Sequence, residues 1–277
     1  MIVRELDATC ASCDTFYRDF VDRQIPVVLR NVGKDWPATK KWNFDYIAQI
    51  GGDISVMASV SNEEQNGQTV KTKASLAKLL NVYKNGIGDN QNNSIPYVKQ
   101  FDLFGMFPQL RDDINLDIWN WRTHCCVNAW LGPAGAVTGV HSDDENNIAV
   151  SILGRKEFTI FAPEDRPYLY VNDKYDPGTE CCSVDHVNPA LELHPLYSSA
   201  DPAVVVLNPG DGLFIPLNWW HGVRNLDASI SINAFASTPL ETVRYGSFRL
   251  LYWVLHNLGL YKYGNCVCHA SRFIEYS

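Results

Sequence analysis

The feature that most constrains the fold is a series of short apolar segments in the second half of the chain. From Cys126 onward, Gly, Pro, Asn and Asp residues separate these segments. They are residues 127–131, 136–141, 148–153, 157–161, 204–207, 213–216, 222–226 and 229–235. Short strands separated by turn residues are typical of a sandwich, jelly roll or barrel. We therefore predict a mainly β fold.

Helical patterns flank this region. We expect helices at 16–21, 44–50 and 74–83, and a short buried strand at 25–30. After the last predicted strand, apolar residues again fall at helical spacing, namely Phe248, Leu251, Tyr252, Leu255 and Leu258. The β core does not need the apolar face of this C-terminal helix, so the helix is a candidate homodimer contact.

Composition and charge exclude several classes of protein. The net charge is −8 and 46% of the residues are hydrophobic. A sizeable core is expected, and the acidic balance argues against nucleic acid as a partner while it allows a basic peptide. The first ten residues contain no apolar signal region, and residues 250–260 are too short to span a bilayer. We expect a soluble protein of the cytoplasm and/or nucleus, with no membrane partner.

Eight cysteines fit an intracellular protein if they stay reduced. Four of them form two short motifs, Cys10-x-x-Cys13 and Cys266-x-Cys268, and His269 follows the second. Because chain ends often lie close together, these residues could meet as a zinc site. The alternative is a set of unpaired thiols, since neither motif has the spacing of an established zinc module.

A candidate metal site combines His141-Ser142-Asp143 with His221, far downstream. Residues two apart on a strand point to the same side, so His141 and Asp143 could bind one ion with His221 as the third ligand. Two histidines and one carboxylate can hold non-haem Fe(II) with coordination positions left open. The motif alone is weak, because a lone histidine on a strand is more often an ordinary half-buried residue.

Lys156 begins a predicted strand on the same side as Phe158 and Ile160, the core-facing set. A lysine on an apolar face is costly unless it meets an anion. The sequence therefore suggests an anion-binding lysine, with a strand-end lysine that reaches solvent as the alternative.

Several motifs occur together and in order along the chain. They are Asn128-Ala129-Trp130-Leu131-Gly132-Pro133, Thr138-x-x-His141-x-Asp143-x-x-x-Asn147, Gly154-Arg155-Lys156 and Pro209-Gly210-Asp211-x-Leu213-Phe214-Ile215-Pro216-x-x-Trp219-Trp220-His221. In these motifs the chain closely resembles the JmjC-domain oxygenases, most of all the small JmjC-only protein hydroxylases. The likeness covers residues 10 to 237.

The resemblance implies a double-stranded β-helix, a cupin-like jelly roll, with an α/β N-terminal part and C-terminal helices. The chain would be a single oxygenase domain, 1–277. We expect its N-terminal α/β part at 1–125, its β-helix core at 126–237 and its C-terminal helical region at 238–277.

The resemblance also implies roles for individual residues. His141, Asp143 and His221 match the iron ligands and are thus the implied catalytic residues. Lys156 matches the lysine that binds the distal carboxylate of 2-oxoglutarate. The other implied co-substrate residues are Tyr97, Thr138, Asn147 and Asn233. Trp130 would either line the pocket floor or pack in the core.

The activity implied by the resemblance is that of an Fe(II)- and 2-oxoglutarate-dependent dioxygenase, which uses O2 to hydroxylate a protein side chain of the Arg, Lys or Asn/Asp type. One alternative is demethylation of methylated lysine or arginine. Another is a catalytically silent JmjC binding module, although no implied iron ligand is missing. An RNA-modifying enzyme is disfavoured by the net charge of −8.

Two segments near the implied site allow two interpretations each. Asp144 and Glu145, directly after Asp143, could attract a basic substrate or form a solvated turn. Residues 166–201 are long for a connection between core strands. They could be a substrate-binding or lid insert, or an ordered surface excursion.

Overall fold

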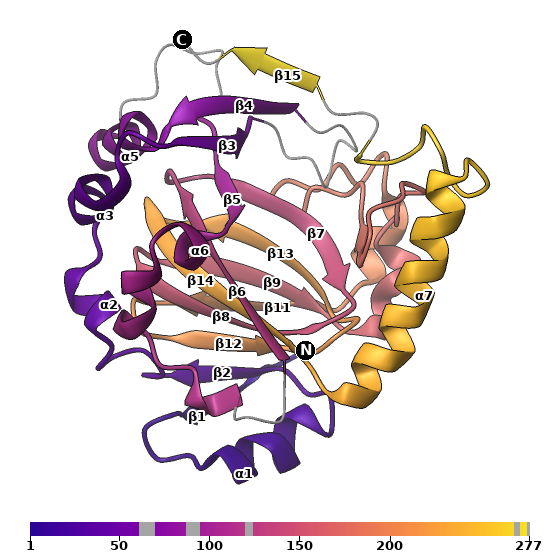
Figure 1. Ribbon diagram of the computed structural model, residues 1–277. Helices are drawn as coiled ribbons and strands as arrows, with labels where there is room; N and C mark the ends of the chain where they lie inside the picture. Colours follow the sequence, from indigo (N-terminus) through magenta and orange to yellow (C-terminus); the bar gives the residue numbers. More distant parts are fainter. Residues whose placement is uncertain (61–69, 87–94, 120–123, 269–271, 276–277) are drawn as a thin grey trace.

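Two facing β-sheets form the centre of the molecule (Figure 1). The computed structural model describes residues 1–60, 70–86, 95–119, 124–268 and 272–275. Within these residues, the larger sheet has seven strands in the order β1-β2-β12-β8-β14-β6-β5. Their bounds are β1 Arg4–Asp7, β2 Val27–Arg30, β12 Gly212–Ile215, β8 Asn146–Leu153, β14 Ser229–Ser237, β6 His124–Gly132 and β5 Val98–Phe101.

The second sheet carries most of the residues singled out from the sequence. Its described strands follow the order β10-β7-β13-β9-β11, and every neighbouring pair is antiparallel. Their bounds are β10 Thr179–Cys181, β7 Val137–Asp143, β13 Trp220–Asn225, β9 Lys156–Phe161 and β11 Ala203–Leu207.

Strand β8 explains why the larger sheet is buried on both faces. Successive side chains of a strand point to opposite faces, so Ile148 and Ala149 enter different cores. Ala149 joins a cluster that contains Phe158 and Ile160 of the second sheet. Ile148 joins the larger cluster, which includes the helical residue Ile47. Helices thus cover the outer face, and the second sheet covers the inner one.

The described helices are short except for α7. They are α1 Cys13–Phe16, continued by a π-helical turn at Tyr17–Val21, then α2 Pro37–Lys41, α3 Phe44–Gly51, α5 Leu76–Asn85, α6 Leu103–Met106 and α7 Pro239–Asn257. Short 3-10 turns lie at Pro108–Asp113, Asp117–Trp119, Pro163–Tyr168 and Pro195–Ser199. Helix α7 begins with a capping box, in which Thr238 accepts from the Glu241 amide and Glu241 accepts from the Thr238 amide.

A small third sheet lies beside the open end of the two main sheets (Figure 1). Strand β3, Ser55–Ser59, pairs antiparallel with β4, Val70–Ser75. Strand β15, Arg272–Glu275, pairs parallel with β4. The last described segment of the chain therefore returns to the N-terminal part.

The predicted mainly β jelly-roll architecture is confirmed, and each of the apolar segments predicted as strands lies within or overlaps a strand. The helix predicted at 74–83 begins later, at Leu76, because Ser75 ends β4 and accepts a hydrogen bond from the Lys78 amide as the N-cap. The strands that were not predicted are β1, β3, β4, β5, β10 and β15. Among them, β10 and β15 pair with strands distant in the sequence, so no local pattern reveals them. The C-terminal region predicted as helical thus holds α7 and also β15.

Of the two interpretations of the terminal cysteines, a zinc site that joins both ends of the chain does not agree with the structure. Helix α1, which begins at Cys13, lies at the opposite end of the molecule from β15 (Figure 1). The Cys13 thiol instead donates to the carbonyl oxygen of Asp117, at 3.4 Å. His269 lies outside the described residues. None of the described helices is long and apolar enough to cross a membrane.

Candidate active site

Antiparallel pairing of β7 and β13 brings the three predicted metal ligands together. His141 and Asp143 share one side of β7, and His221 pairs directly with His141 across the sheet. Asp143 Oδ2 lies 3.9 Å from His141 Nε2 and 3.7 Å from His221 Nε2. Two metal–ligand bonds of about 2.1 Å can span up to about 4.2 Å, so one ion can reach all three atoms.

Backbone carbonyls orient both imidazole rings. The Nδ1–H of His141 donates to Gly139 O at 2.9 Å, and that of His221 to Trp219 O at 3.3 Å. This leaves each Nε2 lone pair directed towards Asp143, as in metal sites where outer hydrogen bonds fix the tautomer. Burial lowers the pKa of His221 well below its ordinary value, so this ring is neutral and able to bind a metal.

Asp143 is held from its other side by the insert at 166–201. Thr179 on β10 donates to Asp143 Oδ1 at 3.4 Å, which leaves Oδ2 for the two histidines. Burial raises the pKa of this carboxyl. A divalent cation between the three side chains would favour the carboxylate form and offset that cost.

One cavity of about 350 Å³ adjoins this triad, and all the predicted site residues line it. Strands of both main sheets contribute to its wall. The predicted residues are Tyr97, Thr138, His141, Asp143, Asn147, Lys156, His221 and Asn233. Trp130 lines the same cavity and also contacts Phe235, with 6.2 Å between ring centroids. Trp130 thus combines the two roles between which the sequence left a choice.

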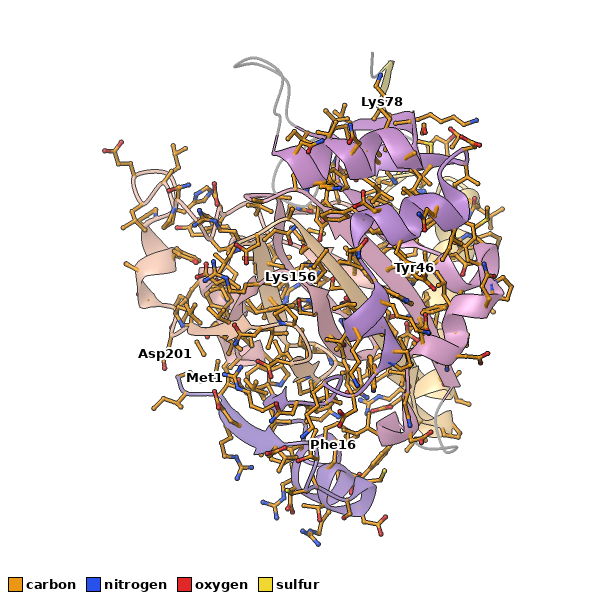
Figure 2. All side chains as sticks on the ribbon, turned by 90° about the vertical axis from the view of Figure 1, so that its left-hand side faces the viewer. Met1, Phe16, Tyr46, Lys78, Lys156 and Asp201 are labelled. Carbon is orange, nitrogen blue, oxygen red and sulfur yellow. The ribbon has the colours of Figure 1, made fainter. Side chains whose placement is uncertain are left out.

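Lys156 lines this cavity and lies in the interior of the molecule, with 3% of its surface exposed (Figure 2). Its ammonium group donates to Ser231 Oγ at 2.6 Å and to Tyr97 Oη at 3.2 Å. No carboxylate among the described residues pairs with it, and burial lowers its pKa to about 7. The alternative of a strand-end lysine that reaches solvent is therefore wrong.

Asn147 adds a second set of unsatisfied polar atoms. Neither its Nδ2 nor its Oδ1 has a hydrogen-bond partner among the described residues, although both are buried. Buried amides without partners are costly and are usually satisfied by water or a ligand. A small molecule with carboxylate and carbonyl oxygens, placed between Asn147 and Lys156, would accept hydrogen bonds from the Lys156 amine and from Asn147 Nδ2, whereas Asn147 Oδ1 requires a donor such as water.

Three residues at the site were missed from the sequence. Ser231 could have been found, because it lies two positions before Asn233 on the same face of β14. Thr179 and His186 belong to the insert, where nothing in the local pattern marks them. His186 packs so closely on Gly222 that a Cβ on this glycine would lie 2.5 Å from its ring. Burial lowers the pKa of His186 to about 4, so its ring is neutral.

The acidic residues after Asp143 contact α7 instead of the cavity. Asp144 forms an ion pair with Arg249, which also lies 4.0 Å from a Glu145 oxygen. The cavity lining carries mixed charge, from Lys71, Lys99 and Asp176. The acidic run is therefore paired with α7 and does not form a freely solvated turn.

The insert at 166–201 covers the metal-ligand strand. Its strand β10 pairs with β7, with Thr179 opposite Asp143 and Cys181 opposite His141. Asp176, Thr179 and Cys181 line the cavity. The insert is thus part of the site wall, and its role in substrate binding stays a prediction.

Comparison with known proteins identifies the family to which the chain is related. A profile described as a cupin-like domain matches residues 13–239. Lysine-specific demethylase 8 of Xenopus tropicalis is 31% identical over 234 residues, which are 81% of this chain and 51% of that protein. The chain thus spans about half the length of this relative.

Two further relatives are named for other activities. The bifunctional peptidase and (3S)-lysyl hydroxylase JMJD7 of Homo sapiens is 26% identical over 272 residues, 85% of this chain and 84% of that protein. The tRNA wybutosine-synthesizing protein 5 of Gallus gallus is 28% identical over 244 residues, 80% of this chain and 73% of that protein. With a cupin-like match over most of its length, a jelly-roll fold and these relatives, the chain belongs to the cupin-like family and, within it, to the JmjC-domain proteins.

Proposed function

We propose that this chain is an Fe(II)- and 2-oxoglutarate-dependent dioxygenase that hydroxylates a protein side chain. The observation that carries the proposal is Lys156, a buried cation with no described counter-charge, in the same cavity as a two-histidine, one-carboxylate cluster. A buried amine of this kind loses its charge near neutral pH unless an anionic partner stabilises the ammonium form. A dicarboxylate that also reaches the metal would supply this partner.

In this proposal His141, Asp143 and His221 hold Fe(II), for which their donor set is suited. Lys156 and Tyr97 bind the distal carboxylate of 2-oxoglutarate, helped by Thr138. Asn147 and Asn233 line the cavity and would hydrogen-bond oxygens nearer the metal. Fe(II) with 2-oxoglutarate and O2, when bound, supplies the oxidising power needed to hydroxylate an unactivated C–H bond.

The residues of this chain provide orientation and exclude water. Trp130, Phe158 and Phe235 give the cavity apolar walls. The insert covers the Asp143 side of the metal cluster through β10. The substrate side chain would enter the same cavity, whose lining also includes Lys99 and Asp176.

The substrate class follows from the relatives by analogy. One relative is named as a lysine demethylase and another as a lysyl hydroxylase, so we infer that a protein side chain is the target. Hydroxylation of an N-methyl group would release it, so demethylation remains the alternative on the same site. A third relative is named for tRNA wybutosine synthesis, but a chain with a net charge of −8 is a poor binder of RNA phosphates.

The proposal is tested by succinate formation from 2-oxoglutarate with purified protein, Fe(II) and ascorbate. Pools of peptides containing Arg, Lys, Asn or methylated Lys serve as substrates, and a tRNA pool serves as a further arm. We expect peptide-dependent succinate with the unaltered protein and none with Asp143→Ala. Equal turnover by Asp143→Ala would refute the metal-site assignment.

Product analysis separates hydroxylation from demethylation. A hydroxylated peptide gains one oxygen atom, whereas a demethylated peptide loses a methyl group and releases formaldehyde. Binding of Fe(II) and 2-oxoglutarate without turnover on any pool would instead favour a silent binding module. Turnover only with tRNA would overturn the protein-substrate proposal.

We also propose a cellular location and a self-association for this chain. None of the cysteines whose side chains the structure describes forms a disulfide, which agrees with a reducing compartment such as the cytoplasm or nucleus. Helix α7 buries one described side chain, His256, and exposes a long apolar surface. We propose that a second copy of the chain covers this surface.

A further inference from the structure

A second group of metal-binding side chains lies at the end of α7, outside the site described above. It consists of His256, Cys266 and Cys268, whose ligand atoms all lie within 4.8 Å of one another. We propose that these three residues bind a structural Zn(II) ion. This site is independent of the proposed oxygenase function.

The distances and burial fit one zinc ion. His256 Nε2 lies 3.2 Å from Cys268 Sγ. Zinc bonds of about 2.0 Å to nitrogen and 2.3 Å to sulfur can span up to about 4.3 Å, so one ion can reach both atoms. Cys266 and His256 are buried, whereas Cys268 is exposed, so an ion would sit at the edge of the molecule. The fourth position of a tetrahedral ion is left to water or a further ligand.

The histidine is already oriented for such a role. Its Nδ1–H donates to the carbonyl oxygen of Tyr261 at 2.8 Å, so its Nε2 carries the lone pair and faces Cys268. A carbonyl behind the ring is the usual partner of a zinc-bound histidine. The Tyr175 ring lies against the imidazole, with 4.4 Å between centroids, and fixes its plane.

The donor set selects zinc over the metal of the oxygenase site. Two thiolates with one imidazole suit Zn(II), which prefers sulfur and nitrogen ligands in tetrahedral geometry. The triad of His141, Asp143 and His221 contains a carboxylate and no sulfur, which suits Fe(II). The chain thus offers two chemically distinct metal sites.

The site would tie three parts of the chain together. Cys266 and Tyr175 of the insert are backbone partners in an isolated parallel β-bridge. The Tyr175 amide donates to Asn265 O at 2.9 Å, and the Val267 amide donates to Tyr175 O at 3.2 Å. His256 comes from the last turn of α7. Figure 1 shows that the chain then runs from the end of α7 towards β15 beside β4.

Zinc in this cluster would also affect the active site, because the cluster adjoins the oxygenase cavity. Val267 and Cys268 line the oxygenase cavity, as do Met57 and Lys71 of the third sheet. Zinc would therefore fix one part of the cavity wall. The metal would hold the insert, α7 and the C-terminal segment in one arrangement beside the cavity.

The first test measures zinc by elemental analysis in full-length protein carrying Asp143→Ala, which disables the other metal site. We expect one zinc per chain, lost when Cys268→Ser is added and kept when Cys10→Ser is added. Both cysteines are exposed, so their replacement should leave the fold intact, as circular dichroism would check. Loss of one ligand should weaken zinc binding by at least about 100-fold.

The second test needs no variant and uses thiol alkylation of the unaltered protein. Cys10 and Cys268 are both exposed, so both should react if neither binds a metal. We expect Cys268 to be protected until a chelator removes zinc, while Cys10 reacts throughout. Replacement of zinc by Co(II) should produce thiolate charge-transfer absorption that Cys268→Ser diminishes.

Three results would overturn the proposal. One is protein without zinc whose Cys268 is alkylated as fast as Cys10. Another is zinc that persists in the Cys268→Ser and Cys266→Ser variants. The third is a disulfide between Cys266 and Cys268 in freshly purified protein, shown by mass before and after reduction.

Discussion

At the scale of single residues, Lys156 favours binding of the co-substrate but lowers the stability of the folded protein. Its amine is buried and its pKa is lowered to about 7, so folding without an anion is costly. We expect Lys156→Met to raise the free energy of unfolding by about 2 kcal/mol without 2-oxoglutarate, because desolvation outweighs the hydrogen bonds to Ser231 and Tyr97. The same change should weaken 2-oxoglutarate binding by about 100-fold.

Denaturant unfolding and calorimetric titration with 2-oxoglutarate measure the two effects. Arg155→Met is the matched control, since it removes the neighbouring cation, whose side chain is half exposed and pairs with Asp227. It should change stability by less than about 1 kcal/mol and leave binding unchanged. A Lys156→Met protein that is less stable, or that binds 2-oxoglutarate normally, would contradict this account.

The lowered pKa of Lys156 also predicts a pH dependence. Between pH of about 7 and 10.5 the unfolded chain holds the Lys156 proton and the folded protein does not, so the Lys156 contribution to stability rises with pH. The stabilising effect of Lys156→Met should therefore shrink between pH 7 and pH 9. In the same window, binding of 2-oxoglutarate should take up a proton. Calorimetry in buffers of different ionisation enthalpy would detect it, and an absence of proton uptake would argue against Lys156 as the carboxylate partner.

At the scale of elements, the insert at 166–201 and the metal-ligand strands behave as one packed unit. His186 lies against Gly222, next to His221, with no room for a Cβ. We expect Gly222→Ala to cost about 1–3 kcal/mol of unfolding free energy and to lower metal affinity, because the insert must shift. Gly246→Ala on α7 meets no atom within 4 Å and should be neutral or stabilising.

A double-mutant cycle with His186→Ala isolates this contact. If the packing argument is right, His186→Ala should make room for the new methyl group and recover part of the loss caused by Gly222→Ala. Strictly additive effects in thermal unfolding would show that the two residues do not act on each other.

At the scale of the whole molecule, the exposed apolar face of α7 predicts self-association. Val243, Leu251, Val254 and Leu258 are exposed and lie along one side of the helix. We expect a dimer in light scattering at micromolar concentration and a monomer for Leu251→Glu. Leu193→Glu, at an even more exposed apolar site in the insert, should leave the dimer intact. A monomeric unaltered protein would refute the contact.

The predictions from the sequence agree with the structure best for features that depend on the local residue pattern. Alternation predicted the strands that carry His141, Asp143 and Lys156, and the resemblance placed Tyr97 and Asn233 at the same cavity. Neither could reveal that Thr179 supports Asp143, because β10 exists only through its pairing with β7. Likewise, His256 as a partner of Cys266 and Cys268 depends on how the chain turns after α7, which no local pattern encodes.

The pairing of β10 with β7 also makes the insert a reporter of metal occupancy. Asp143 and Thr179 are cross-strand partners, and the Cys182 amide donates to Val140 O at 2.8 Å. An ion that binds only the folded triad lowers the population of every local opening that separates these strands. Amide hydrogen exchange in residues 179–183 should therefore slow when the iron site fills. A segment without any metal ligand would then record, through its exchange rate, whether a metal is bound on the neighbouring strand.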